Sequence, residues 1–194
     1  MIKIGITGSL ASGKTTASKI ISSGKGPLFS ADLVVKKLYK LDKFKQIISR
    51  KFNINKNSNI KRIKKDKIIS GEKSIKALEK ILHPLVRREM KSFIKKNKHK
   101  KFLFFEIPLL IESKLVENFN LILFIKARKK VRLKRFRSRG GNVKLFKILN
   151  NKQLSDAKKA QFCDHVIVNE KNLKILKKKL TDIFKKYERN ISGY

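Results

Sequence analysis

The chain has 194 residues, of which 41% are hydrophobic, enough for one globular domain with a buried core and a small inserted subdomain. Its single cysteine, Cys163, excludes an internal disulfide and fits a reducing compartment. The N-terminus lacks the charged and apolar segments of a signal peptide, and the longest apolar runs are too short to cross a bilayer. We therefore expect a soluble, cytoplasmic protein with no membrane partner.

The charge of the chain is extreme, with 51 Lys and Arg against 14 Asp and Glu and a formal net charge of +37. One interpretation is a surface that binds nucleic acid or another polyanion. The other is a compositional bias, because Lys, Ile, Asn and Phe are abundant throughout. A nucleic-acid footprint should be clustered. The lysines are instead spread over nearly every segment, which favours the second interpretation.

Short apolar runs alternate along the chain with longer segments of helical periodicity. Two runs are continuously apolar, as in strands buried on both faces: FLFF at 102–105 and LILFI at 121–125. Further strands are expected at 2–7, 27–30 and 166–168, and helices at 14 to about 23 and about 173 to 187. The alternation predicts an α/β fold with a parallel sheet and right-handed crossovers.

Residues 32–100 interrupt this alternation with a long segment of helical periodicity that contains no convincing strand. Residues 53–59 (NINKNSN) form a polar stretch inside it, so we expect a helical insertion with an internal loop. His83, followed by Pro84, lies in the insertion. It is either structural, for example at a helix end, or a ligand-binding residue.

Residues 8–15 read GSLASGKT and match the phosphate-binding pattern G-x-x-x-x-G-K-[ST]. In this pattern Gly8 ends the strand, and Gly13 lets the backbone approach phosphate oxygens. The amide groups of the loop and the positive end of the following helix bind the anion. Lys14 would reach the β- and γ-phosphates, and the Thr15 hydroxyl would ligate Mg²⁺. A nucleoside triphosphate site is therefore the firmest prediction.

Two carboxylates follow predicted strands. Asp32 comes after the second strand, and Glu106 directly after FLFF. The carboxyl ends of strands in an open parallel sheet face the ligand crevice. Asp32 could accept a proton from a substrate hydroxyl there, and Glu106 could hold Mg²⁺ through water. The alternatives are a helix cap for Asp32 and a loop or capping role for Glu106. Pro108, shortly after, fits the first turn of a helix.

Residues 128–139 (RKKVRLKRFRSR) are the densest basic run. They could form a nucleic-acid patch, a solvated helix face, or a lid that grips phosphates, with the glycines at 140–141 as its hinge. Arg132, Arg135 and Arg139 lie three and four residues apart, and we expect them to share a helix face.

Together these motifs resemble dephospho-CoA kinase, a P-loop kinase family of coenzyme A biosynthesis, through nearly the whole chain. The loop resembles the family's T-G-G-x-x-[SA]-G-K-[ST], and SAD at 30–32 resembles D-A-D. LHPLV at 82–86 is similar to L-H-P-x-[VI], and EIPLLIE at 106–112 to D-[IV]-P-L-L-[FY]-E. The order and spacing of Q-x(5)-K-x(3)-A-D-x-V-I-x-N are kept by Gln153, Lys159, Asp164, Val166, Ile167 and Asn169.

The resemblance implies a three-layer P-loop kinase domain over 1–194, with a five-stranded parallel sheet, a helical substrate-binding insertion at 32–100 and a lid at 128–145. It implies phosphorylation of the ribose 3′-hydroxyl of dephospho-CoA, with ATP and Mg²⁺ as cofactors. Asp32 would be the general base, and Arg135 and Arg139 in the lid, together with Lys14, would stabilise the transferring phosphoryl group. The substrate would contact Asp32, His83, Glu106 and Leu109. The ATP-binding set would be Gly8, Ala11, Ser12, Gly13, Lys14, Thr15, Thr16, Arg135 and Asn169.

Among the departures from the family pattern, Ser9, Ser30, Glu106 and Cys163 stand where Gly, Asp, Asp and Ala are usual. None of them removes the loop lysine, Asp32 or the lid arginines, so we expect activity.

Two alternatives remain beside this function. One is a P-loop kinase of another nucleoside or nucleotide. The other is a basic nucleic-acid-binding protein that uses ATP as a switch. The scattered lysines and the lack of Trp, with only three Tyr, argue against the second alternative.

Overall fold

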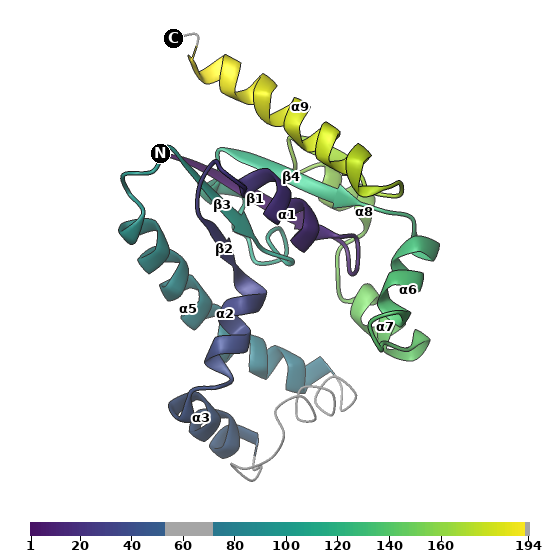
Figure 1. Cartoon of the computed structure of the whole chain (residues 1–194). Coiled ribbons are helices and arrows are strands. Elements are labelled where there is room, and N and C mark those ends of the chain that lie inside the picture. The colour runs from purple at the N-terminus through teal and green to yellow at the C-terminus, as the bar shows by residue number, and fades with distance from the viewer. Residues whose placement is uncertain (53–71, 193–194) are drawn as a thin grey trace. The chain divides into compact units, whose positions relative to one another are not determined.

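The computed structural model describes residues 1–52 and 72–192, shown as the coloured ribbon in Figure 1. The chain divides into two compact units, one formed by Met1–Ser30 with Asn97–Tyr194 and the other by Ala31–Lys96. The polar loop expected at 53–59 lies outside the described residues.

The first unit is built on a five-stranded parallel sheet with the order β2-β3-β1-β4-β5. The strands are β1 (Ile2–Gly8), β2 (Leu28–Ser30), β3 (Phe102–Glu106), β4 (Leu121–Lys126) and β5 (His165–Val168). All five strand predictions are confirmed, with ends displaced by one residue at most. The predicted three-layer α/β fold with a parallel sheet is confirmed as well.

Strand β1 lies at the centre of the sheet, with β3 and β2 on one side of it and β4 and β5 on the other. The order in which successive strands are added to the sheet therefore reverses at β1. This strand pairs directly with β3 and with β4. In an open parallel sheet, the crevice at such a switch point, outside the carboxyl ends of the strands, is where ligands bind. The GSLASGKT loop follows β1 at this point.

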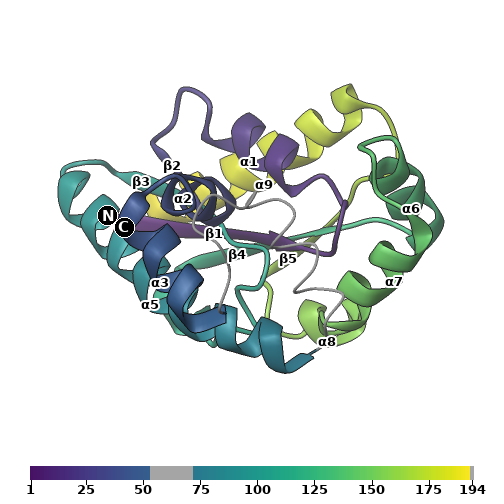
Figure 2. The ribbon, with the colours of Figure 1, turned by 90° about the horizontal axis from the view of Figure 1, so that it is seen from below.

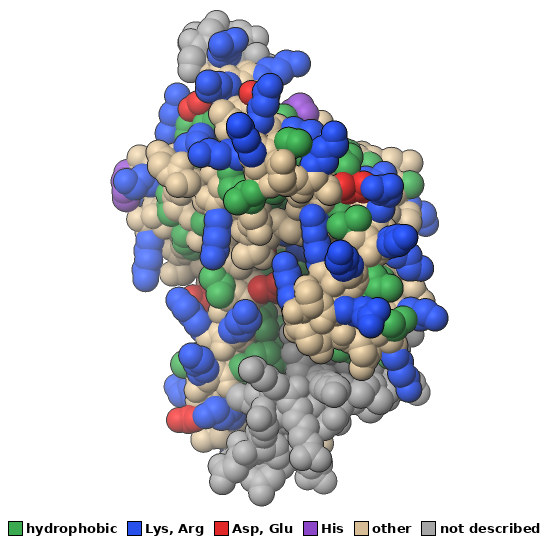
Figure 3. All heavy atoms as spheres, turned by 45° about the vertical axis from the view of Figure 1, so that its right-hand side comes forward, with side chains coloured by type: hydrophobic (Ala, Val, Ile, Leu, Met, Phe, Trp, Pro, Cys, Tyr) green, Lys and Arg blue, Asp and Glu red, His purple; other side chains and the backbone are tan. Residues whose placement is uncertain are grey.

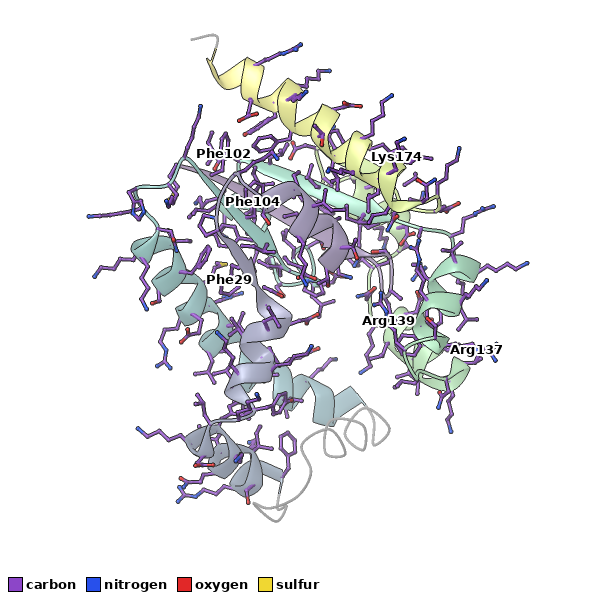
Figure 4. All side chains as sticks on the ribbon, in the orientation of Figure 1. Phe29, Phe102, Phe104, Arg137, Arg139 and Lys174 are labelled. Atoms are coloured by element: carbon purple, nitrogen blue, oxygen red, sulfur yellow. The ribbon has the colours of Figure 1, made fainter. Side chains whose placement is uncertain are left out.

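Two helices cover one face of the sheet, α1 (Lys14–Ser22) and α9 (Leu173–Ser192). Their apolar residues join alternate strand residues in one core, which includes Ile21, Leu180 and Phe184. Figure 2 shows α1 and α9 on one side of the sheet and α8 (Asp156–Ala160) on the other. Figure 4 labels Phe102 and Phe104 of β3, both of which pack against Phe184.

Three further elements complete this unit: the 3₁₀ helix η1 (Val116–Asn118), α6 (Lys129–Arg137) and α7 (Val143–Asn151). Helices α7 and α8 begin at side-chain caps, because Asn142 accepts from the Leu145 amide at 2.8 Å and Ser155 from the Lys158 amide at 3.3 Å. None of the helices within 1–52 and 72–192 is both long and apolar enough to cross a membrane.

The second unit contains α2 (Ala31–Leu38), α3 (Asp42–Phe52) and α5 (Glu72–Lys96). Its core gathers Leu38, Tyr39, Phe44, Ile48 and Leu78, with the Tyr39 and Phe44 rings in an edge-on contact at 5.1 Å. The helical character of the segment is confirmed in its described part. Its role in binding substrate stays a prediction.

Candidate functional site

The GSLASGKT loop joins the end of β1 to the start of α1, where the first amide groups of the helix have no intrahelical partner. The first turn of α1 has no acidic residue, and Thr15 and Thr16 are exposed. Gly13 has φ 98°, and a Cβ atom there would lie 2.2 Å from Asn169 Nδ2. A Cβ atom on Gly8 would lie 2.4 Å from the Ile125 carbonyl oxygen, so both positions require glycine.

Lys14 is the first residue of α1 and is buried. Its Nζ donates to the carbonyl oxygen of Ser9 at 3.0 Å, which places the ammonium group against the backbone of the loop. A cation and a row of helix N-terminal amides at one loop form a site for an anion such as a phosphate.

Glu106 ends β3 and is 2% exposed. The Thr15 hydroxyl donates to its Oε1 at 2.5 Å, and the Ser30 hydroxyl donates to its Oε2 at 3.0 Å. Ser30 and Glu106 are register partners on β2 and β3, which explains the second contact. The loop or capping alternative for Glu106 is therefore wrong, because this carboxylate is a buried acceptor that holds the loop threonine.

The pair of Thr15 and Glu106 fits the requirements of a Mg²⁺ site. Mg²⁺ in nucleotide enzymes keeps several waters and takes one or two protein oxygens together with substrate phosphates. The Thr15 hydroxyl would be the direct ligand, and Glu106 would act through water. Among the described residues, no group of three or more His, Cys, Asp or Glu is placed to hold a metal ion.

Asn169 and Arg135 both bind the backbone of the loop at Ser12. Asn169 Nδ2 donates to the Ser12 carbonyl oxygen at 2.8 Å, and Arg135 donates to the same oxygen at 3.2 Å and to the Asn169 carbonyl at 3.0 Å. Their predicted contacts with ATP stay predictions. In the structure both side chains fix the shape of the loop next to Gly13.

The expectation that Arg132, Arg135 and Arg139 share one helix face is wrong for Arg139, because α6 ends at Arg137. Arg139 is exposed beyond the helix, and Figure 4 shows it and Arg137 on opposite sides of the α6 and α7 ribbons. The amides at 140 and 141 donate to carbonyls of α6 and close its end. The predicted hinge and lid roles of this region stay predictions.

Arg132 is buried, and its guanidinium group donates hydrogen bonds to other groups of the protein. It binds the Ala127 carbonyl at 3.0 Å and the Asn150 side-chain oxygen at 2.8 Å. Burial lowers the pKa of the Arg132 guanidinium, and the nearby Asp156 carboxylate opposes that shift. Arg132 is therefore a structural link between α6 and α7.

The structure adds two residues that the sequence did not assign to the site. The Leu10 amide donates to Gln153 Oε1 at 2.8 Å, and the Ser9 hydroxyl donates to the Asp156 carboxylate. Gln153 belonged to the tail motif but had no role there. No motif marked Asp156, because its partner Ser9 lies 147 residues away in the chain.

Asp32 and His83 belong to the helical unit. Asp32 is exposed in the first turn of α2, and no hydrogen bond of its side chain occurs among the described residues. His83 is half-buried inside α5, and Pro84 lies within the same helix, so a helix-end position for His83 is wrong. The predicted roles of both residues stay predictions.

Residues 108–114 form successive turns after β3, so the helix expected to begin at Pro108 is absent from this segment. Leu109 is half-buried, and its carbonyl accepts from the Ser113 amide at 2.9 Å. Its predicted substrate contact stays a prediction.

Comparison with solved structures supports the fold. A Thermus thermophilus protein, TT1252, superposes with a TM-score of 0.80 at 25% identity, covering 95% of this chain and 97% of its own. A dephospho-CoA kinase from Campylobacter jejuni gives a TM-score of 0.62 at 22% identity, covering 95% of this chain and 96% of its own.

Comparison of sequences gives the family. The family model described as dephospho-CoA kinase matches residues 2–174. The dephospho-CoA kinase of Bartonella quintana is 35% identical over 175 residues, 88% of this chain and 90% of that protein. The dephospho-CoA kinase of Bartonella henselae is 32% identical over 192 residues, 96% of this chain and 98% of that protein. With a phosphate loop, a buried loop-bound glutamate and these relatives, the chain belongs to the dephospho-CoA kinase family.

Proposed function

We propose that this protein transfers the γ-phosphoryl group of ATP to the ribose 3′-hydroxyl of dephospho-CoA, giving ADP and CoA. The observation that supports this most directly is the GSLASGKT loop at the sheet switch point, with its threonine held by the buried Glu106. Family membership supports the choice of acceptor.

Phosphoryl transfer requires in-line positioning and neutralisation of charge more than covalent chemistry. The loop amides and Lys14 bind the β- and γ-phosphates. The 3′-oxygen forms a bond to the γ-phosphorus while the bond to the bridging oxygen breaks and its electrons leave on ADP. Asp32 accepts the hydroxyl proton, and Arg139 stabilises the charge on the transferring group.

The chemistry that Mg²⁺ would supply here is neutralisation of phosphate charge. The Thr15 hydroxyl and Glu106 are the groups of this chain that would hold the ion. His83 and Leu109 contact dephospho-CoA, and closure of the 128–145 lid excludes water and so limits ATP hydrolysis.

The charge of +37 reflects a compositional bias, and the protein acts in the cytoplasm on a small molecule. In Figure 3, Lys and Arg side chains are scattered over the described part of the visible face without a single basic band. A nucleic-acid footprint would gather them on one face or along one helix.

A coupled ADP-release assay across dephospho-CoA, AMP and a panel of nucleosides tests the function. Dephospho-CoA should give the highest kcat/KM by at least about a hundredfold, because a site built around one acceptor loses binding energy with truncated substrates. Equal turnover of AMP would overturn the assignment of the acceptor but leave the phosphate loop in place.

A further inference from the structure

The segment from the end of α7 through α8 (residues 150–160, the α7–α8 segment) contacts the outer half of the phosphate loop. Gln153 accepts the Leu10 amide proton at 2.8 Å, and Asp156 accepts the Ser9 hydroxyl proton. The same Ser9 offers its carbonyl oxygen to Lys14 Nζ and, at 3.1 Å, to the Ser12 amide. Two consecutive loop residues are thus fixed from outside the loop.

The residue after them, Ala11, has φ 59°, in the left-handed region. This conformation is unfavourable for a residue with a Cβ atom and persists where its neighbours are held. On its N-terminal side the chain is held by Gln153. On its C-terminal side Asn169 and Arg135 bind the Ser12 carbonyl.

The α7–α8 segment is itself anchored by a buried ion pair. Lys159 is 0% exposed, and its ammonium group lies 2.9 Å from a carboxylate oxygen of Glu112 in the turn after β3. The same Glu112 oxygen accepts the Leu154 amide proton at 3.0 Å. At the other end, Arg132 binds the Asn150 side chain. Removing one partner of a buried pair is costly, so the segment is a firm support.

We propose that Gln153 and Asp156 are positioning residues that keep the outer half of the phosphate loop, and Ala11 in particular, in the conformation that binds ATP. In the Ser9–Asp156 contact, the hydroxyl comes from Ser9, one of the departures from the family pattern. The proposal rests on the role of the loop as the ATP site and does not depend on the identity of the phosphoryl acceptor.

The first experiment removes the acceptor oxygen of Gln153 by the substitution Gln153→Ala. Loss of one hydrogen bond to a half-buried amide should weaken binding of a non-hydrolysable ATP analogue, measured by calorimetry, about tenfold. The KM for ATP should rise by a similar factor, while the KM for dephospho-CoA changes less than about twofold. Gln153→Glu keeps an acceptor oxygen and should recover most of the affinity.

The matched control is Asn151→Ala, which removes an exposed amide side chain two residues away. It should leave nucleotide affinity unchanged. A purely structural role for Gln153 would lower the melting temperature and affect both substrates alike, and unchanged affinity for the ATP analogue in Gln153→Ala would overturn the proposal.

The second experiment tests the conformation of Ala11. Adding Ala11→Gly to Gln153→Ala should restore at least a third of the lost affinity, because glycine adopts positive φ without a steric cost. In the otherwise unchanged protein, Ala11→Gly should alter affinity by less than about threefold. A double variant no better than Gln153→Ala would overturn the conformational part of the proposal.

The third experiment is a double-mutant cycle between Ser9→Gly and Asp156→Ala. Alanine is a strong helix former and removes both acceptor oxygens of Asp156. Each single change should weaken binding of the ATP analogue roughly three- to tenfold, and the double change should be no worse than the larger single effect. Additive losses would show that the two residues act independently and would exclude this contact as a positioning device. Binding of the ATP analogue does not require a phosphoryl acceptor. Failure of this proposal can therefore be distinguished from failure of the proposed function.

Discussion

The phosphate loop and the helical unit present their functional residues in different ways. In the loop, Thr15 and Lys14 are held by protein groups, Glu106 and the Ser9 carbonyl. In the helical unit, Asp32 is exposed and His83 half-buried, and no hydrogen bond of the Asp32 side chain occurs among the described residues. The loop residues of the proposed nucleotide site are therefore fixed by other protein groups, whereas the substrate roles of Asp32 and His83 stay predictions.

This difference makes two kinds of substitution distinguishable. A change in the loop or its supports should alter nucleotide affinity, since it disturbs an arrangement that exists in the folded protein. A change at Asp32 should alter turnover and leave nucleotide affinity and folding stability nearly unchanged.

The largest effect is expected from Lys14→Ala. Loss of the ammonium group removes a positive charge that we propose binds the β- and γ-phosphates, so turnover should fall at least about a thousandfold. The measurement is ADP release at saturating substrates. Lys19→Ala, an exposed lysine of the same helix, is the control and should keep near-normal activity. A Lys14→Ala enzyme close to the unmodified rate would contradict the assignment of the loop.

Asp32→Asn comes next, with turnover reduced about a hundredfold because the general base is lost. Asparagine also suits a helix start, so α2 should stay intact. Binding of ATP, measured by calorimetry, should change less than about twofold. Asp42→Asn alters another first-turn aspartate of the helical unit, one paired with Lys45, and should leave turnover unchanged. Normal turnover in Asp32→Asn would remove Asp32 as the base.

Glu106→Gln should raise the Mg²⁺ concentration for half-maximal activity about tenfold, because one amide oxygen cannot accept from both Thr15 and Ser30 while supporting a cation. Loss of charge-assisted hydrogen bonds should also cost about 2 kcal/mol, or ~4–8 °C in melting temperature. Glu117→Gln, at an exposed glutamate, is the matched control. An unchanged Mg²⁺ requirement would show that Glu106 does not support metal binding.

The smallest effect concerns Cys163, which follows α8 and donates to the Lys159 carbonyl at 3.1 Å. Burial, with a smaller contribution from Asp164, raises the pKa of its thiol to about 12. At pH 8 iodoacetamide should alkylate the native chain at least about tenfold more slowly than the urea-unfolded chain. Since the folded state holds this proton more tightly, the contribution to stability should decline as pH rises from about 9 toward 12. Equal rates would show that the packing around α8 is loose.

The sequence predicted the elements that depend on local pattern. Continuous apolar runs such as FLFF indicated the buried strands, and GSLASGKT indicated the loop between a strand and a helix. The errors arose where a local rule competed with tertiary context. Pro108 suits a helix start but is followed by turns, Pro84 lies inside α5, and the basic run ends its helix before Arg139.

The chain by itself determined the anion site, because glycines, lysine and threonine at fixed spacing define a phosphate loop wherever strand and helix flank it. Only the tertiary structure decided what holds that loop. Glu106, Asn169, Gln153 and Asp156 reach it from β3, the end of β5 and the α7–α8 segment, 91 to 157 residues away along the chain. Such contacts leave no periodicity or local spacing in the sequence, since they arise from the order in which a parallel sheet brings distant strand ends together.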